Sequence, residues 1–143
     1  MKRIHKTIPY IFILCGIFFL CPLSAQEKKT GPFLKIKDPK YNFGFVRQGS
    51  TVKIEYEFIN SGTDTLHILT VEVTCGCTVA DFPHYPIKPG DSGIILITFN
   101  TKEFIDRTDR TLHVISNASN SPTSIRFKGV ILKNKSEKKD KKE

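Results

Sequence analysis

The feature that most constrains the fold is a strict alternation of apolar and charged side chains between residues 52 and 58. Val52, Ile54, Tyr56 and Phe58 are separated by single Lys or Glu residues. Successive side chains of a β-strand point to opposite faces, so this segment would be apolar on one face and charged on the other. We predict a strand here, with one face against a core and the other in solvent.

Further segments rich in β-branched and aromatic residues are separated by turn-forming residues, which predicts more strands. They are expected at residues 41–46, 66–74, 93–99, 111–116 and 124–132, with weaker candidates at 34–36 and 78–82. Both faces of the 93–99 segment are apolar, so we expect that strand to be central and covered on both sides. We expect one short helical turn within residues 102–110. About seven short strands within about 100 residues predict an all-β protein, an immunoglobulin-like β-sandwich spanning residues 33–132.

The first 25 residues have the pattern of a secretory signal peptide. Lys2, Arg3 and Lys6 precede an apolar run that ends near a small-residue cleavage site at Ala25. An uncleaved membrane anchor is the weaker alternative, because the apolar run is short and is interrupted by proline and glycine. We therefore predict export to the periplasm or the medium, and a short mobile leader at residues 26–32.

The formal charge of +8 belongs mainly to the two ends of the chain. Three basic residues would leave with the signal peptide, and the lysines of residues 133–143 carry most of the remaining excess. We expect this Lys-rich tail to be disordered, because it has nothing apolar to bury. A nearly neutral body argues against nucleic-acid binding, and membrane contact is expected only through the signal peptide or, weakly, through the basic tail.

The only motif with evident chemistry is Cys75-Gly76-Cys77, since Cys15 and Cys21 would depart with the signal peptide. In an extended strand these two Cα atoms would lie roughly 6.6 Å apart, at the outer limit for a disulfide. A bridge therefore requires a bend, which Gly76 would permit.

Three interpretations of this pair stay open. The first is structural: the cysteines are small residues at a tight corner of the sandwich, either reduced or joined in an inert local disulfide by an oxidising compartment. The second is a copper(I) site of the two thiolates, with His67, His84 or His113 as additional ligands. The third is a thiol-disulfide exchange site, because a small-ring disulfide would be readily reduced. Zinc is less suitable, because a structural zinc site needs four ligands.

The chain contains none of the short motifs typical of hydrolases, phosphate-binding loops or zinc proteases. We therefore predict no catalytic residues and no bound cofactor apart from the copper alternative. The expected function is that of an exported, non-enzymatic binding or scaffolding module of the bacterial cell envelope, with another envelope protein as its partner. The alternative is a copper-binding or thiol-redox protein that uses Cys75 and Cys77.

An ordered set of residues between Tyr41 and Val130 resembles the bacterial domain-of-unknown-function family 1573. The most specific part is Cys75-Gly76-Cys77-Thr78 followed by Pro86-Ile87 and Pro89-Gly90; Phe43-Gly44, Phe58, Asn60, Gly62 and Gly129-Val130 also match. The resemblance implies an immunoglobulin-like sandwich, similar to Hydin-type and major-sperm-protein-like domains that act as interaction or scaffold modules. It implies no established reaction. Residues 103–110 depart from the family pattern, because charged residues including Asp106 and Arg110 stand where a glycine-containing turn is usual.

Overall fold

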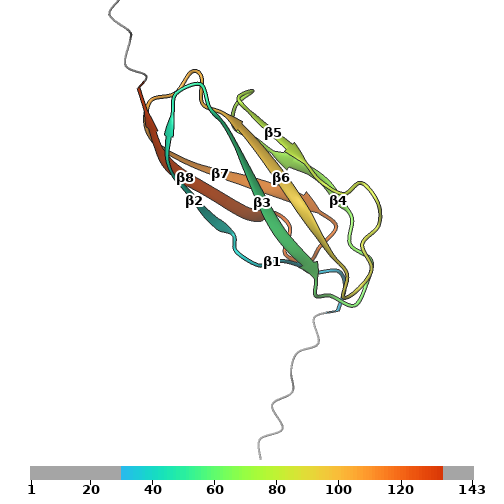
Figure 1. Cartoon of the computed structure of the whole chain (residues 1–143). Coiled ribbons are helices and arrows are strands. Elements are labelled where there is room, and N and C mark those ends of the chain that lie inside the picture. Colours follow the sequence, from blue (N-terminus) through green and yellow to red (C-terminus); the bar gives the residue numbers. More distant parts are fainter. Residues whose placement is uncertain (1–29, 134–143) are drawn as a thin grey trace, which may run out of the picture.

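The computed structural model describes residues 30–133, which form two four-stranded β-sheets packed face to face (Figure 1). The first sheet has the strand order β1-β3-β6-β5 and the second the order β2-β8-β7-β4. The strands are β1 (Leu34–Ile36), β2 (Lys40–Arg47), β3 (Thr51–Asn60), β4 (Ile68–Glu72), β5 (Thr78–Asp81), β6 (Ser92–Asn100), β7 (Asp106–Ser116) and β8 (Thr123–Leu132). The all-β, immunoglobulin-like sandwich is thus confirmed, with eight strands where about seven were expected.

The alternation in the sequence of β3 appears directly in its burial pattern, because every second side chain from Val52 to Asn60 is buried. β3 pairs antiparallel with β6 over nearly its whole length, and the two strands form the centre of the first sheet. In the second sheet β8 lies between β7, its antiparallel neighbour, and β2, which runs parallel to it. This parallel pair brings the beginning of the domain beside its last strand.

The core lies between the two layers and consists of aliphatic and aromatic side chains from both sheets. The largest fully buried side chains are Tyr56, Phe58, Phe99, Phe127, Leu34, Ile54, Leu66, Ile87, Ile95, Ile97, Leu112 and Ile125. Burial of such side chains is the main favourable contribution to folding. The hydroxyl of Tyr56 adds a polar link between the layers, because its Oη donates to the carbonyl oxygen of Arg126 on β8 at 3.0 Å.

The structure corrects the prediction for β6 on one point. The strand is central, as expected, and its inward residues Ile95, Ile97 and Phe99 are fully buried. Its outer face is not covered, however, because Ile94 is 48% exposed. The domain has only two layers, so nothing from residues 30–133 packs over the outside of this sheet.

The expected helical turn within residues 102–110 is wrong. A single hydrogen-bonded turn occurs where the N–H of Phe104 donates to the carbonyl of Thr101 at 3.1 Å, and β7 begins at Asp106. The strand accommodates Arg107 and Asp109 because they are exposed on either side of the buried Thr108. Asp106 has φ +69°, a conformation that glycine adopts most easily and that aspartate tolerates better than most residues. Asp106 thus has a backbone conformation typical of glycine within the segment where the resemblance implies a glycine-containing turn.

The end of the sandwich at which β3 terminates is organised by the fully buried side chain of Asn60. Its Oδ1 accepts the N–H groups of Phe33 and Gly62, and its Nδ2 donates to the carbonyls of Asp64 and Ile87. The amide therefore has a partner for each donor and acceptor that burial removes from water.

The N-terminal boundary of the domain lies slightly before the expected Phe33. Gly31 exchanges hydrogen bonds with Thr63, and the carbonyl of Pro32 accepts the N–H of Ser119. Gly31 and Pro32, which we expected in a mobile leader, are thus attached to the sandwich. The predicted signal peptide, residues 26–29 of the leader and the tail beyond Lys133 lie outside the described residues. Within residues 30–133, no helix has the length and apolar character needed to cross a membrane.

Candidate functional site

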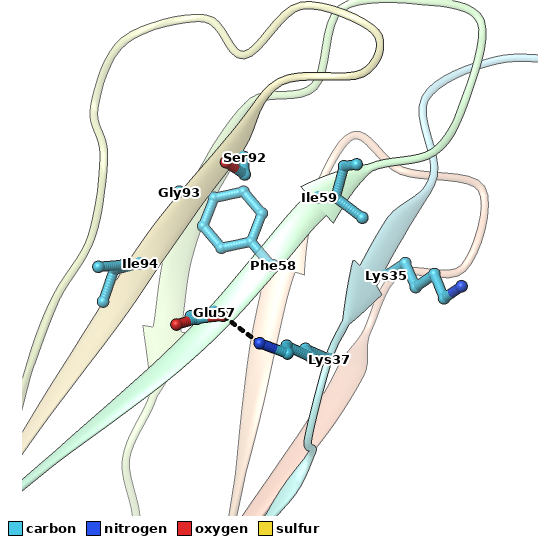
Figure 2. Close-up of a pocket in the computed structure, with 8 residues that line it drawn as sticks. All are labelled: Lys35, Lys37, Glu57, Phe58, Ile59, Ser92, Gly93 and Ile94. Carbon is cyan, nitrogen blue, oxygen red and sulfur yellow. Dashed lines mark hydrogen bonds and ion pairs between the residues drawn. The ribbon is translucent and has the colours of Figure 1, made fainter.

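A groove crosses the outer face of the first sheet at the end where β6 begins, and it is the first of two candidate sites (Figure 2). Its volume is about 690 Å³. The lining residues come from three adjacent strands. They are Lys35 on β1 and Lys37 just after it, Glu57, Phe58 and Ile59 on β3, and Ser92, Gly93 and Ile94 on β6. The strand register brings these residues together, since Lys35 pairs with Ile59 and Glu57 pairs with Ile94.

The groove has an apolar centre because Ile59 and Ile94 are 38% and 48% exposed on the same outer face. Between β3 and β6 the ring of Phe58 lies beside Gly93, as Figure 2 shows. A Cβ added to Gly93 would stand 2.6 Å from Cζ of Phe58, so glycine is required for this ring position. The floor of the groove is therefore formed where the ring of Phe58 lies against the backbone of Gly93.

One side of the groove carries an ion pair, in which Nζ of Lys37 donates to Oε2 of Glu57 at 2.9 Å. The hydrogen bond and charge of Glu57 raise the pKa of the Lys37 ammonium above its ordinary value. Both side chains are well exposed, so the pair contributes little to stability. Lys35, on the same side, forms no ion pair with any other residue of the described domain, which leaves the margin of the groove net positive.

The edge of the sheet next to the groove is closed by a side chain. Asn120 accepts the N–H of Leu34 through Oδ1 at 3.1 Å and donates from Nδ2 to the carbonyl of Leu34 at 2.8 Å. These bonds occupy the backbone N–H and carbonyl of Leu34 at the beginning of β1. Because exposed strand edges are what allow another chain to add as a strand, β1 is a poor site for such pairing.

The second candidate site is the Cys75-Gly76-Cys77 motif, which lies between β4 and β5 at the opposite end of β6. The two cysteines form a disulfide with their Cα atoms 5.3 Å apart. The expected bend is present, because the N–H of Thr78 donates to the carbonyl of Cys75 at 3.3 Å and closes a tight turn. The turn does not depend on glycine: Gly76 lies outside the left-handed region, and a Cβ there would meet nothing within 4 Å.

Arg110 on β7 reaches this disulfide from the other sheet. Its Nη1 lies 3.5 Å from Sγ of Cys75 and 3.4 Å from Oγ1 of Thr74. The guanidinium carbon stands 4.6 Å from the centre of the Phe104 ring and 5.4 Å from that of Phe99, which is the geometry of a cation-π contact. The buried Nε of Arg110 has no hydrogen-bond partner.

An open pocket of about 570 Å³ lies beside Arg110. Thr74 and Phe104 line it together with outward-facing residues of β7, among them Arg107 and His113. Cys77 lies on the opposite side of the disulfide and packs against the hydrophobic core. Both cysteines are half-buried, and the pocket beside Arg110 lies next to Cys75, which Arg110 contacts.

The three histidines considered as additional copper ligands are dispersed. His67 precedes β4, His84 stacks on Phe82 after β5 with ring centres 4.7 Å apart, and Nδ1 of His113 on β7 is 3.1 Å from Oγ of Ser124. No group of three His, Cys, Asp or Glu side chains in residues 30–133 is arranged to hold a metal ion. In this structure the two sulfurs are bonded to each other, so neither is free to bind copper.

Sequence reasoning identified Cys75 and Cys77 but missed Arg110 and the whole of the groove. Arg110 lies far from the cysteines along the chain, and its charge suggested only a surface loop. Ile94 was noticed as apolar but was expected to be covered. The alternation within β3 predicted that Glu57 faces solvent, but only the pairing of β3 with β1 and β6 shows which residues lie beside it.

Among solved structures, a protein of unknown function from Porphyromonas gingivalis W83 is similar, with 20% identity and a TM-score of 0.62. The match covers 76% of this chain and 51% of the other, so the chain spans about half the length of that protein. PapD-like domain 7 of human CEP192 matches at 13% identity and a TM-score of 0.55, covering 71% of this chain and 87% of that domain. At these identities the likeness concerns the fold.

No curated protein matches the chain in sequence. The model of the family described as "Protein of unknown function (DUF1573)" matches residues 34–131, which include both candidate sites and all but the last residue of β8. The chain therefore belongs to the DUF1573 family.

Proposed function

We propose that this chain is an exported, non-enzymatic binding module of the bacterial cell envelope, and that the groove across β1, β3 and β6 is where it contacts another envelope protein. The observation that carries the proposal is that two exposed isoleucines, Ile59 and Ile94, lie at the centre of a groove whose margin is charged. Protein interfaces commonly combine an apolar centre with a polar rim. Export itself rests on the signal-like pattern of residues 1–25.

The chemistry of the groove indicates the chemistry of the partner. Ile59 and Ile94 would be covered by an apolar side chain, which gains free energy by leaving water. Lys35 would contact a carboxylate, because the charge of Lys37 is already matched by Glu57. We therefore propose a partner segment that presents an apolar anchor next to an acidic residue.

Contact through the face is favoured over strand addition at this end of the molecule. Asn120 occupies the backbone groups of Leu34 that an added strand would need. The face also lies on the two central strands of the sheet, which hold Glu57 and Ile94 in a fixed register. A preformed surface loses less conformational entropy on binding than a loop that must become ordered.

Site-specific photocrosslinking in cells of the source organism tests the proposal. A photoreactive amino acid replaces Ile94 in the full-length protein, and Leu69 is the control position because it is also exposed, at 62%, but lies on β4 in the other sheet. We expect a discrete adduct with an envelope protein from position 94 and none of that mass from position 69. The adduct should disappear when Ile59→Lys is introduced as a second substitution.

Two results would count against the groove as a binding site. One is the absence of any discrete adduct from position 94 although the protein is folded and exported. The other is an adduct that persists unchanged with Ile59→Lys, because a cation at the apolar centre should prevent an apolar anchor from binding there.

A further inference from the structure

Arg110 is a half-buried cation that lacks an anionic partner. Residues 30–133 contain two ion pairs, Lys37 with Glu57 and Arg126 with Asp109, and neither includes Arg110. Its polar contacts are Sγ of Cys75 at 3.5 Å and Oγ1 of Thr74 at 3.4 Å, and its buried Nε has none. A disulfide sulfur is neutral and a weak hydrogen-bond acceptor, so the guanidinium is poorly compensated while the disulfide is intact.

Reduction of the disulfide would change this balance. A thiolate on Cys75 would place a full negative charge beside Nη1 of Arg110, and a charge-assisted hydrogen bond is about twice as strong as a neutral one. The rings of Phe99 and Phe104 limit water around the guanidinium, which strengthens the attraction. The reduced protein therefore gains an ion pair where the oxidised protein has only a weak hydrogen bond, and the disulfide becomes easier to reduce.

From this arrangement we propose a further activity: Cys75 and Cys77 form a thiol-disulfide exchange site for the dithiol of an exported protein, in which Cys75 forms the mixed disulfide and Arg110 positions and stabilises it. Cys75 has this role because the open pocket lies on its side, next to Thr74 and Arg110. Cys77 packs against the core and is the resolving cysteine. This activity is independent of the binding role of the groove, which lies at the other end of β6.

The exchange proceeds in two substitutions at sulfur. A thiolate of the substrate attacks Sγ of Cys75, a bond forms between the two sulfurs, and the bond to Cys77 breaks, leaving Cys77 to take up a proton. The second substrate thiolate then attacks the substrate sulfur of the mixed disulfide, and Cys75 leaves as a thiolate beside Arg110. The substrate dithiol loses two electrons and two protons; the cysteine pair gains the two electrons, one proton remains on Cys77, and the other passes to solvent.

The first experiment measures how readily glutathione reduces the disulfide in the purified full-length protein at pH 7. We expect Arg110→Gln to lower the equilibrium constant for reduction about tenfold, which equals about 30 mV for a two-electron couple. Arg110→Lys should recover part of this loss because it keeps the charge. Lys128→Gln is the control, because it removes a positive charge from the exposed face of the neighbouring strand β8, outside the pocket beside Arg110, and should leave the equilibrium within twofold of the wild type.

The second experiment identifies the cysteine that reacts. With oxidised glutathione, Cys77→Ser should form a mixed disulfide on Cys75 at least ten times faster than Cys75→Ser forms one on Cys77. Faster reaction of Cys77, equal reaction of the two, or an Arg110→Gln equilibrium within twofold of the wild type would each overturn the proposal. Circular dichroism of each variant checks that the sandwich is intact, and if Arg110→Gln unfolds, the comparison of the two cysteine variants alone decides between these outcomes.

Discussion

The hydroxyl of Tyr56 should make the stability of the domain depend on alkaline pH. Tyr56 is 1% exposed, and its Oη donates to the carbonyl of Arg126 across the two sheets. Burial raises the pKa of Tyr56 well above its ordinary value, and the nearby Tyr41 adds to the shift. In the unfolded chain the same hydroxyl titrates near pH 10.

The direction of the pH dependence follows from the protonation of the Tyr56 hydroxyl in the folded and the unfolded protein. Below about pH 10 the hydroxyl is neutral in both states, and the contribution of Tyr56 to stability is fully present. Above about pH 10 the unfolded chain loses the proton while the folded domain keeps it, so ionisation favours unfolding. Between pH 8 and pH 11 this group alone should lower the free energy of unfolding by about 1.4 kcal/mol.

The variant Tyr56→Phe isolates this effect. At pH 8 it should be about 1 kcal/mol less stable than the wild type, because it loses one buried hydrogen bond. At higher pH only the wild type loses the contribution of the hydroxyl, so the two stabilities should become equal between about pH 10 and pH 11. Urea unfolding followed by circular dichroism at a series of pH values measures the difference, and equal slopes against urea confirm that the transitions are comparable.

Tyr85→Phe is the matched control, because it removes a tyrosine hydroxyl from a side chain that is 63% exposed and lies outside the buried core. A constant gap between the wild type and Tyr56→Phe from pH 8 to pH 11 would refute the reasoning. Such a result would mean that the hydroxyl ionises equally in the folded and unfolded states, and therefore that it is neither buried nor bonded as described.

Two further variants test how the sandwich is held together. Gly129→Ala on β8 should destabilise the domain by about 1–3 kcal/mol, because the new Cβ would overlap the ring of Phe43. Phe43→Leu in the same chain should recover part of the loss, and full additivity of the two urea measurements would contradict this overlap. Asn60→Ala should lower the free energy of unfolding by about 3 kcal/mol or more in the same assay, because it removes four hydrogen bonds at a fully buried position. A decrease below about 1 kcal/mol would show that water replaces the amide.

Much of the fold could be predicted from the sequence because its central strands carry local signals. The alternation in β3 depends only on residues two apart, so it specifies which side chains face the core without knowledge of any partner. The first half of strand β7 could not be recognised in the same way, because its inward positions are Thr108 and Arg110, which are polar. The period of two is present in the burial of β7, yet hydrophobicity does not reveal it.

The candidate sites were less predictable because each combines residues from separate strands. The bend at Cys75 and Cys77 follows from the length of a disulfide, so the spacing predicted it for the case in which the two cysteines are bridged. The approach of Arg110 depends instead on how the two sheets pack, and nothing near it in the sequence indicates this neighbour. The groove likewise depends on the register of β1, β3 and β6, which places Lys35 beside Ile59 and Glu57 beside Ile94.

β6 explains why the two proposed activities can be separated by mutation. The strand begins with Gly93 and Ile94 at the groove and ends with Phe99 beneath Arg110, so one central element supports both sites at opposite ends. Substitutions in the buried core between these ends alter the packing of the strand and affect both sites at once. Substitutions of surface residues at either end share no contacts, and effects at such separated positions are normally additive. The outward side chain of Ile94 and the half-buried guanidinium of Arg110, which contacts β6 at Phe99, lie at opposite ends of the strand. They are therefore suitable positions at which to change one activity while leaving the other intact.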